Sequence, residues 1–195
     1  MRLIDIWNAI IRNNAGISER QFLSSELDSF MSDPKRRLMM TGRNYYEGKH
    51  DIEKKLRTMV GDDNTLISLP YLPNNRICDN KFDDLVDQKV NYLLAKPLEA
   101  KCEDERMDEI FTREFNQRIT SVARDAYIGG IGYLYPYLQD GELKFKRLKP
   151  GNVLPFWRDE EHEVLDAFIY FYDIEVYKAG IKSTQTYVEF YDKEK

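Results

Sequence analysis

Two acidic runs contain the residues with the clearest potential for metal-assisted chemistry. Asp83, Asp84 and Asp87 fall on successive turns of one expected helix. The second run lies at the expected start of the next helix and comprises Glu103, Asp104, Glu105, Asp108 and Glu109. Carboxylates that converge in space can hold a divalent ion and activate water to cleave nucleic acid. Because the helix dipole also favours acids in a first turn, and because these positions lie opposite the apolar stripes, the sequence favours solvated helix starts over a magnesium site.

Tyrosines and lysines interleave on either side of a predicted tight turn. An Asp-Gly pair at 140–141 lies between two alternating runs, which predicts a two-residue type I′ hairpin. Its register pairs Tyr135 with Lys146 and Tyr137 with Lys144. Interleaved aromatic and basic groups suit stacking on bases and contacts with phosphates, so a nucleic-acid-binding face is one interpretation. The other is a solvent face with lysines lying over tyrosines, and the sequence favours this second interpretation.

The opposite face of the same hairpin is apolar. It comprises Leu134, Pro136, Leu138, Leu143 and Phe145. Residues that directly oppose each other in a ladder share a face, so we expect this set to pack against the helices. Pro136 cannot donate a ladder hydrogen bond, which places its strand at an edge or a bulge.

A basic cluster in the N-terminal third is a candidate subunit-contact face. It comprises Lys35, Arg36, Arg37, Arg43, Lys54, Lys55 and Arg57. Such a cluster is most often a solvated face, and the alternative is contact with an acidic surface of a neighbouring subunit. Residues 1–59 hold 11 lysines and arginines against 8 acids, whereas residues 60–195 hold 18 against 26. The whole chain carries −5, and an acidic chain is poorly suited to tight, passive binding of a phosphate backbone.

Other motifs for catalysis or metal binding are missing from the sequence. His50 precedes an expected helix start, where a surface or capping role is favoured over a metal-binding or catalytic one. His162 lies far from it in the sequence and has different neighbours. No HExxH, CxxC, GxSxG or glycine-rich phosphate loop occurs. We therefore assign no catalytic, cofactor-binding or metal-ligating residue and expect no enzyme activity. Cys78 and Cys102 are a single pair without an export signal, so reduced thiols are expected. No apolar run of about 18 residues is present to span a bilayer.

Helix signals dominate the N-terminal part of the chain. A capping box at Ser18 and Gln21 predicts one helix. Asp33 followed by Pro34 predicts the start of another, which ends near Gly48, because aspartate suits the cap and proline the first helical position. The segment HDIEKKLRTM is interpreted as a third, short helix. The proline- and asparagine-rich residues 60–80 are interpreted as an irregular, extended connection.

Two stronger helical patterns follow. In the first, which ends before Pro97, apolar residues recur at helical spacing: Phe82, Leu85, Val86, Val90, Leu93 and Leu94. We expect these residues to face the core. The second runs from about Asp104 to Ile128, and Gly129 and Gly130 end it.

Beyond Gly130 the periodicity changes to that of strands. Val164–Tyr172 and Thr184–Tyr191 are rich in β-branched and aromatic residues, and with the hairpin they predict a meander of four or five strands over 130–191. Helices followed by antiparallel sheet indicate an α+β fold. We divide the chain into an N-terminal helical arm, 1–59, and an α+β region, 60–195, with its helices at 81–128.

Several segments together resemble the portal proteins of tailed bacteriophages, specifically those of long-tailed phages of Gram-positive hosts. The likeness lies in YYEGKHDI at 45–52, NNRICDNKFDDLVDQKVNYLLAKPL at 74–98, GGIGYLYPY at 129–137 with DGELKF at 140–145, and LKPGNVLPFW at 148–157. These segments occur in the family's order with similar spacing, and the likeness covers roughly residues 45–172. The first 44 residues match only as a helical arm.

The resemblance implies a structural subunit without a cofactor. In this family about twelve copies form a ring at one vertex of the capsid, and DNA passes through its channel during packaging and infection. The implied partners are further copies of the chain, phage DNA, the ATP-hydrolysing terminase, and the capsid and head-completion proteins, with no membrane involved. The implied locations are the virion and, during assembly, the host cytoplasm.

Longer members of the family continue into stem helices, a clip and a tunnel-lining loop. We therefore expect this chain to be the N-terminal and wing portion of a portal protein, with those parts absent. The hairpin's tyrosines and lysines are then expected to support the wing sheet or a neighbouring subunit. A metal-dependent nucleic-acid enzyme and a small nucleic-acid-binding module remain the alternatives.

Overall fold

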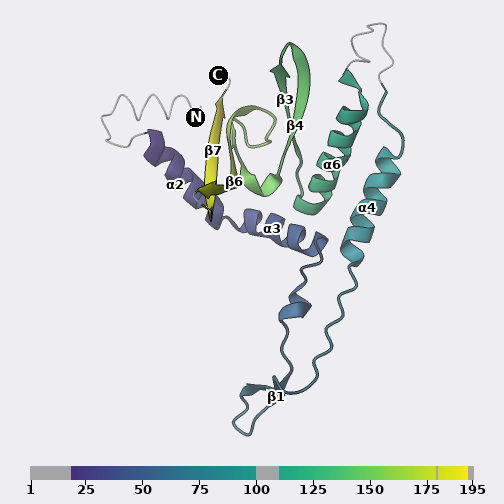
Figure 1. The fold of residues 1–195 in the computed structure, drawn as a ribbon, viewed down its shortest axis with the longest axis vertical. Helices are drawn as coiled ribbons and strands as arrows, with labels where there is room; N and C mark the ends of the chain where they lie inside the picture. Colours follow the sequence, from purple (N-terminus) through teal and green to yellow (C-terminus); the bar gives the residue numbers. More distant parts are fainter. Residues whose placement is uncertain (1–18, 100–109, 179, 193–195) are drawn as a thin grey trace.

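The computed structural model describes residues 19–99, 110–178 and 180–192. In it, helices flank two long antiparallel β-ribbons on both sides and pass beneath them (Figure 1). The helices are α2 (Glu19–Ser32), α3 (Pro34–Tyr46), α4 (Lys81–Leu94) and α6 (Arg113–Gly129), with 3-10 turns η1 (Asp51–Lys54) and η2 (Pro150–Asn152). The strands are β1 (Thr58–Val60), β2 (Leu66–Ser68), β3 (Tyr133–Gln139), β4 (Glu142–Leu148), β5 (Val153–Trp157), β6 (Leu165–Lys178) and β7 (Ile181–Asp192). The predicted α+β class is confirmed.

The junction between α2 and α3 follows the predicted capping rules. The Asp33 carboxylate accepts a 2.8 Å hydrogen bond from the Lys35 backbone N–H, and Pro34 occupies the first helical position. The carboxylate satisfies one of the N–H groups that a helix start leaves unpaired, and proline has no N–H to lose there. α3 ends at Tyr46, and Gly48 follows with a φ of +77°, close to the predicted end.

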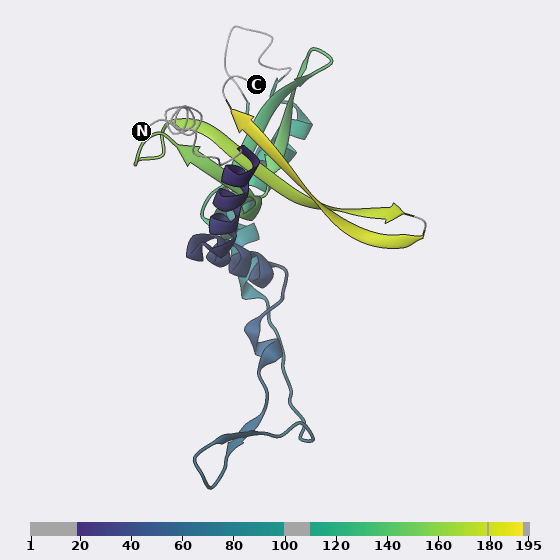
Figure 2. The same ribbon diagram turned by 90° about the vertical axis from the view of Figure 1, so that its left-hand side faces the viewer.

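Residues 55–77 form an arm that projects far from the rest of the molecule (Figure 1, Figure 2). Its end is the antiparallel β1–β2 hairpin, whose loop is closed by a 2.8 Å hydrogen bond from the Gly61 N–H to the Thr65 carbonyl. This arm separates α3 from α4 along the chain and brings their ends back together at its base.

The arm corrects two predictions. The helix expected over HDIEKKLRTM is wrong beyond Lys54, because Thr58–Val60 pair with Leu66–Ser68 as strands. The irregular connection expected over 60–80 likewise contains β2. The proposed boundary between residues 59 and 60 falls inside β1, and the division of the chain into two units stays a prediction.

α4 lies against α6, and both helices contact α3. Val86 and Val90 of α4 are buried, as predicted. Leu85 and Leu93, which the periodicity also assigns to the core, are exposed. The covered stripe of α4 is therefore narrower than its apolar pattern.

α6 starts at Arg113, where the Thr112 hydroxyl accepts a 3.2 Å hydrogen bond from the Phe115 N–H. Cys102 lies outside the described residues. So do the acids expected at the start of this helix, which are Glu103, Asp104, Glu105, Asp108 and Glu109. The helix ends as predicted, because Gly130 takes a φ of +79° as a left-handed cap. Across the described ranges, no helix has both the length and the apolar character needed to cross a bilayer.

The β3–β4 hairpin has the predicted register. Tyr135 opposes Lys146 and Tyr137 opposes Lys144. Both residues of the turn at 140–141 take positive φ, 54° and 82°, as a type I′ turn requires. Among the described strands, β3 pairs only with β4, so its proline lies on an edge strand, as expected.

The apolar face of this hairpin packs on α6 only in part. The Phe145 ring meets the Phe115 ring of α6 edge-on, with centroids 4.8 Å apart. Leu138 and Leu143, next to the turn, are exposed. The predicted packing on the helices therefore holds at Phe145 and is wrong at the tip.

β5, β6 and β7 form a second antiparallel sheet, separate from the β3–β4 pair. The chain passes between the two sheets through η2, where Pro150 and Gly151 are buried, so the single meander expected over 130–191 is divided. Leu148 of β4, Val153 and Tyr170 form the core between the sheets. Past this core, β6 and β7 continue as a long two-stranded ribbon (Figure 2).

Candidate subunit-contact surfaces

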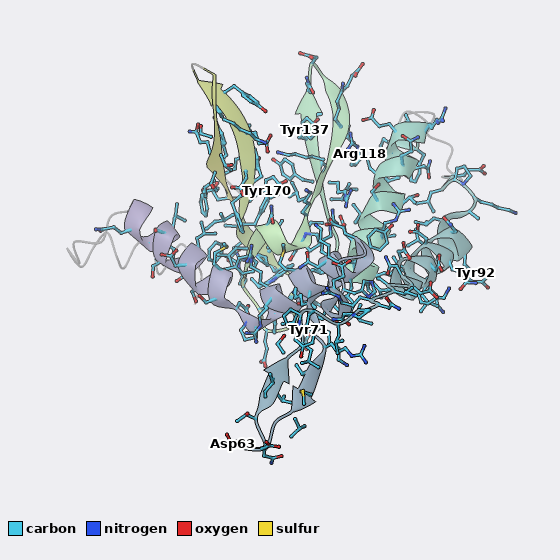
Figure 3. All side chains as sticks on the ribbon, turned by 60° about the horizontal axis from the view of Figure 1, so that its bottom comes forward. Asp63, Tyr71, Tyr92, Arg118, Tyr137 and Tyr170 are labelled. Atoms are coloured by element: carbon cyan, nitrogen blue, oxygen red, sulfur yellow. The ribbon has the colours of Figure 1, made fainter. Side chains whose placement is uncertain are left out.

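The tyrosine and lysine face of the β3–β4 hairpin is turned toward the second sheet. The Tyr135 ring lies 5.8 Å from that of Phe168 and 5.0 Å from that of Tyr191, centroid to centroid. It also stacks on Tyr137 at 6.4 Å. Tyr137 and Tyr170 lie in the space between the two β-ribbons (Figure 3). Tyr135 therefore serves packing between sheets.

Lys146 takes part in a polar cluster in the same space. Its ammonium lies 5.1 Å from the Tyr170 ring centroid and 3.4 Å from a carboxylate oxygen of Glu189 on β7. The hydroxyls of Tyr172 and Tyr191 donate hydrogen bonds of 2.8 and 2.7 Å to the same carboxylate. One half-buried acid thus gathers three donors from β4, β6 and β7.

These contacts shift the pKa values of the cluster in opposite directions. Burial raises the pKa of Glu189, but the hydrogen bonds from Tyr191 and Tyr172 and the charge of Lys146 outweigh it, and the pKa lies below 4.5. Burial, and then the hydrogen bond to Glu189, raise the pKa of Tyr191 above 10. The fold therefore favours an ionised Glu189 beside neutral tyrosines.

Glu189→Gln is expected to lower the free energy of unfolding at pH 7 by about 1 kcal/mol, because an amide accepts more weakly than a carboxylate. A depressed folded pKa contributes stability above about pH 4.5 that is lost as the pH falls through the folded value. The variant should therefore lose less stability than the parent between about pH 5 and 3. Urea unfolding at a series of pH values measures both effects.

Glu175→Gln on the same ribbon is the matched control. Glu175 pairs with Lys182 at 2.7 Å, and both side chains are more than half exposed. Exposed pairs contribute little, so this change should leave stability and its pH dependence nearly as they are. Equal effects of the two substitutions would contradict a special role for Glu189.

Tyr137 and Lys144 lie nearer the open end of the hairpin. The Lys144 ammonium lies 3.5 Å from the Glu142 carboxylate, and both Lys144 and Tyr137 are half-buried. This end is free of the polar cluster around Glu189. Its use in contacts between subunits stays a prediction.

The basic residues predicted as one cluster form two separate groups. Lys35, Arg36 and Arg37 lie at the start of α3, whereas Lys54, Lys55 and Arg57 lie beyond its end, at the base of the arm. α3 has 13 residues, so the groups are about 20 Å apart along its axis. Neither group has been tested as a subunit contact, and that role stays a prediction for both.

Arg36 makes its contacts within the chain. Its Nε donates a 2.8 Å hydrogen bond to the Gly151 carbonyl. Its guanidinium also lies 5.8 and 5.6 Å from the ring centroids of Phe30 and Phe171. Arg36 therefore joins α2, α3, η2 and β6, and a cation held over two rings is stabilised there.

A buried carboxylate joins α3, α6 and β4. Asp125 of α6 is 1% exposed. Its Oδ1 accepts hydrogen bonds from Arg43 of α3 at 3.1 Å and from Nη2 of Arg147 of β4 at 2.6 Å, and its Oδ2 accepts one from Nε of Arg147. The hydrogen bond to Asp125 raises the pKa of Arg147. Arg43, predicted as part of the basic cluster, instead contacts this buried acid, which the sequence did not indicate.

The described acids that were considered as alternative metal ligands make other contacts. Asp87 accepts a 2.8 Å hydrogen bond from Arg124 and a 3.1 Å hydrogen bond from the Tyr46 hydroxyl. The hydrogen bond from Arg124 is the main reason that the pKa of Asp87 is lowered. Asp84 lies 3.8 Å from Lys81. Within residues 19–99, 110–178 and 180–192, no three His, Cys, Asp or Glu side chains converge as metal ligands would.

His50 and Cys78 lie at the base of the arm. His50 Nε2 is 3.0 Å from Oδ1 of Asn80, and the Asn80 amide donates to the Tyr46 carbonyl at 3.0 Å. The Cys78 thiol is 3.7 Å from the Gly48 carbonyl and is a free thiol. His50 thus helps to fix the arm where it leaves α3.

The arm itself is the surface that sequence analysis missed. Two short runs, Thr58–Val60 and Leu66–Ser68, each with two apolar residues and one hydroxyl residue, flank the turn-forming residues 61–65. Short β-prone runs around a glycine-containing loop are a hairpin signal. The signal is short, which is why the helical interpretation of the preceding residues prevailed.

Comparison with known families decides the relationship. A family model described as phage portal protein, SPP1 Gp6-like, matches residues 32–195. The chain belongs to this family. The predicted resemblance to portal proteins is therefore confirmed, and the match begins within α2, earlier than the expected start at residue 45.

Two portal proteins illustrate the relationship. The portal protein of Clostridium phage phiCD119 is 27% identical over 174 residues, which cover 80% of this chain and 38% of that protein. The portal protein of Bacillus phage SPP1 is 25% identical over 166 residues, which cover 80% of this chain and 33% of that protein. The matched part of the chain therefore spans between about a third and two-fifths of the length of these portal proteins.

Proposed function

We propose that this chain is the wing portion of a subunit in a phage portal ring of about twelve copies at one capsid vertex. The match of residues 32–195 to the portal family carries the proposal. Genomic DNA passes through such a ring during packaging and ejection, while terminase, capsid and head-completion proteins bind it. Assembly takes place in the host cytoplasm, and the finished ring is part of the virion.

The contacts within the chain support a structural role. Asp125 ties two helices to a sheet, Glu189 ties the two sheets together, and Asp87 ties α4 to its neighbours. The acidic side chains that could in principle take part in catalysis or metal binding thus fix the relative positions of secondary structure elements. A ring subunit needs this rigidity, because its neighbours bind to surfaces that must stay in register.

The charge of the chain suits a conduit for DNA. Each copy carries −5, so about twelve copies carry about −60, and a field of this sign opposes adsorption of DNA to the ring. DNA that must move through a channel benefits from weak binding. The role proposed is passage without hydrolysis by this subunit.

The full-length protein is expected to form closed rings of a single stoichiometry. Native mass spectrometry gives the number of subunits, and electron microscopy of the same sample shows whether the assembly is closed. Incubation of the rings with DNA and magnesium should leave the DNA intact. A full-length protein that stays monomeric at micromolar concentration would overturn the proposal.

A further inference from the structure

The arm of residues 55–77 has an unusual distribution of apolar side chains. None of its residues is buried, yet eight large apolar side chains are exposed on it: Leu56, Met59, Val60, Leu66, Ile67, Tyr71, Leu72 and Ile77. Leu66 and Ile77 expose 73% and 82% of their surface. Single exposed apolar residues are ordinary, whereas a contiguous set on one projecting element marks an interaction surface.

Both faces of the β1–β2 hairpin are apolar. Met59 opposes Ile67, and Val60 opposes Leu66. Because neighbouring residues of a strand point to opposite faces, the first pair covers one face and the second pair the other. A hairpin with one face in water normally carries polar residues there, and an isolated two-stranded hairpin is marginally stable. This hairpin therefore needs a partner that covers it.

The arm is held in a defined shape before any partner binds. Side chains donate hydrogen bonds to backbone carbonyls across its two legs, from Asn74 to Lys55 at 2.9 Å, from Arg57 to Pro73 at 3.0 Å, and from Arg76 to Glu53. The contacts of Asn80 hold its base. An element that is already ordered loses little conformational entropy on binding, so it is suited to docking.

α4 carries an exposed apolar face of matching character. Tyr92 and Leu93 follow Leu85 by seven and eight residues, which is about two helical turns. The three side chains therefore share one side of the helix. All three are exposed, Tyr92 to 85%, and Tyr92 lies at the periphery of the molecule (Figure 3). Asp84 is exposed in the first turn of the same helix.

The charges of the two surfaces are complementary. The arm carries Lys55, Arg57 and Arg76 on its legs against Asp62 and Asp63 in its loop, which leaves it one positive charge in excess. α4 carries Asp83, Asp84 and Asp87 against Lys81 and Lys89, which leaves it one negative charge in excess. Opposite charges beside apolar patches fix the orientation in which two surfaces meet. Within one chain the arm points away from its own α4 (Figure 1), so one copy cannot make this contact alone.

We infer that the arm of one copy packs on the exposed face of α4 in a second copy. The inference rests on the proposed ring and adds to it a contact between named surfaces. Because arm and α4 are different surfaces, each copy donates its arm to one neighbour and receives the arm of the other. Repetition of such a heterologous contact closes a ring when the rotation between copies allows it.

Photo-crosslinking of the full-length protein tests the contact. A benzophenone amino acid in place of Leu66 is irradiated in rings assembled from mixed ¹⁵N-labelled and unlabelled protein. The expected result is crosslinked peptides that join residue 66 of one isotope to residues 81–94 of the other. The same amino acid in place of Leu38, an exposed side chain on α3, is the control and should not label α4.

The outcomes separate this inference from the proposed function. Rings that form normally but give crosslinks from residue 66 only within one copy, or only to other segments, overturn the arm contact and leave the ring standing. A protein that never assembles overturns the ring and with it the contact.

Substitution of the arm gives an independent measurement. Leu66→Asp with Ile67→Asp should raise the concentration needed for half-maximal assembly by about tenfold or more, because two central apolar contacts are replaced by charges. The melting temperature of the unassembled protein should stay unchanged, since neither residue is buried. Leu38→Asp is the matched control and should assemble like the parent. Unchanged assembly of the double variant overturns the inference.

Discussion

Replacing Asp125 with alanine is expected to lower the free energy of unfolding by about 3 kcal/mol. Asp125 is 1% exposed and is the common acceptor for Arg43 and Arg147. Without it, two cations that are roughly three-quarters covered face each other across the junction of α3, α6 and β4 with no carboxylate between them. Both the lost hydrogen bonds and the repulsion act against the folded state.

Two other variants show whether charge or packing is responsible. Asp125→Asn keeps the shape and one acceptor but removes the charge, so it should cost about half as much as alanine. Asp87→Ala also removes an acid paired with an arginine, but the Asp87 side chain is 43% exposed. An exposed pair is worth about 1 kcal/mol or less, so Asp87→Ala should be the mildest of the three.

Urea unfolding followed by circular dichroism measures all three variants, provided that each transition is cooperative. The expected order of stability is parent, Asp87→Ala, Asp125→Asn and then Asp125→Ala. An Asp125→Ala protein as stable as the Asp87→Ala protein would contradict the role assigned to the buried carboxylate.

Elements set by a few neighbouring residues were predictable from the sequence. The cap at Asp33 and Pro34, the turn at 140–141 and the register of β3 with β4 all follow from backbone rules that act within a few residues. The left-handed cap at Gly130 belongs to the same class. Each of these is confirmed, because little else in the fold competes with the local preference.

The contacts that join elements were not predictable. Asp125 meets Arg147 and Arg43 across separations of 22 and 82 residues, and no local pattern distinguishes these three from surface charges. The same limit applies to Asp87, which the sequence offered only as an alternative metal ligand, since its partner Arg124 lies 37 residues away. A single sequence shows which groups are charged, whereas the fold decides which of them meet.

The Tyr and Lys face illustrates the limit within one hairpin. The register placed Tyr135 and Lys146 on one face correctly. At Tyr135 and Lys146 that face contacts β6 and β7 and is only partly open to solvent, because the two sheets pack on each other. Periodicity assigns residues to a face but not the element that covers it, and the exposed Leu85 and Leu93 of α4 show the same limit in reverse.

Gly42→Ala is expected to lower the free energy of unfolding by about 2 kcal/mol, although alanine is the better helix former. Gly42 lies in α3 where that helix meets α6, and a Cβ placed on it would lie 2.4 Å from the Ile128 carbonyl oxygen. The obstacle is backbone, so no side-chain rotation relieves it, and the two helices must move apart. That movement also strains the Arg43–Asp125 contact beside it.

Gly129→Ala is the matched control, because it makes the same change at the other helix of the contact. A Cβ on Gly129 would meet Pro150 at 3.5 Å, an ordinary van der Waals distance. Gly129 has no positive φ, so alanine there should be neutral or stabilising by up to about 1 kcal/mol. Thermal unfolding of both variants measures the difference. A Gly42→Ala protein whose melting temperature equals or exceeds that of the Gly129→Ala protein would show that α3 and α6 do not depend on this close approach. The packing of the helices around Asp125 would then have to be looser than the distance between Gly42 and Ile128 implies.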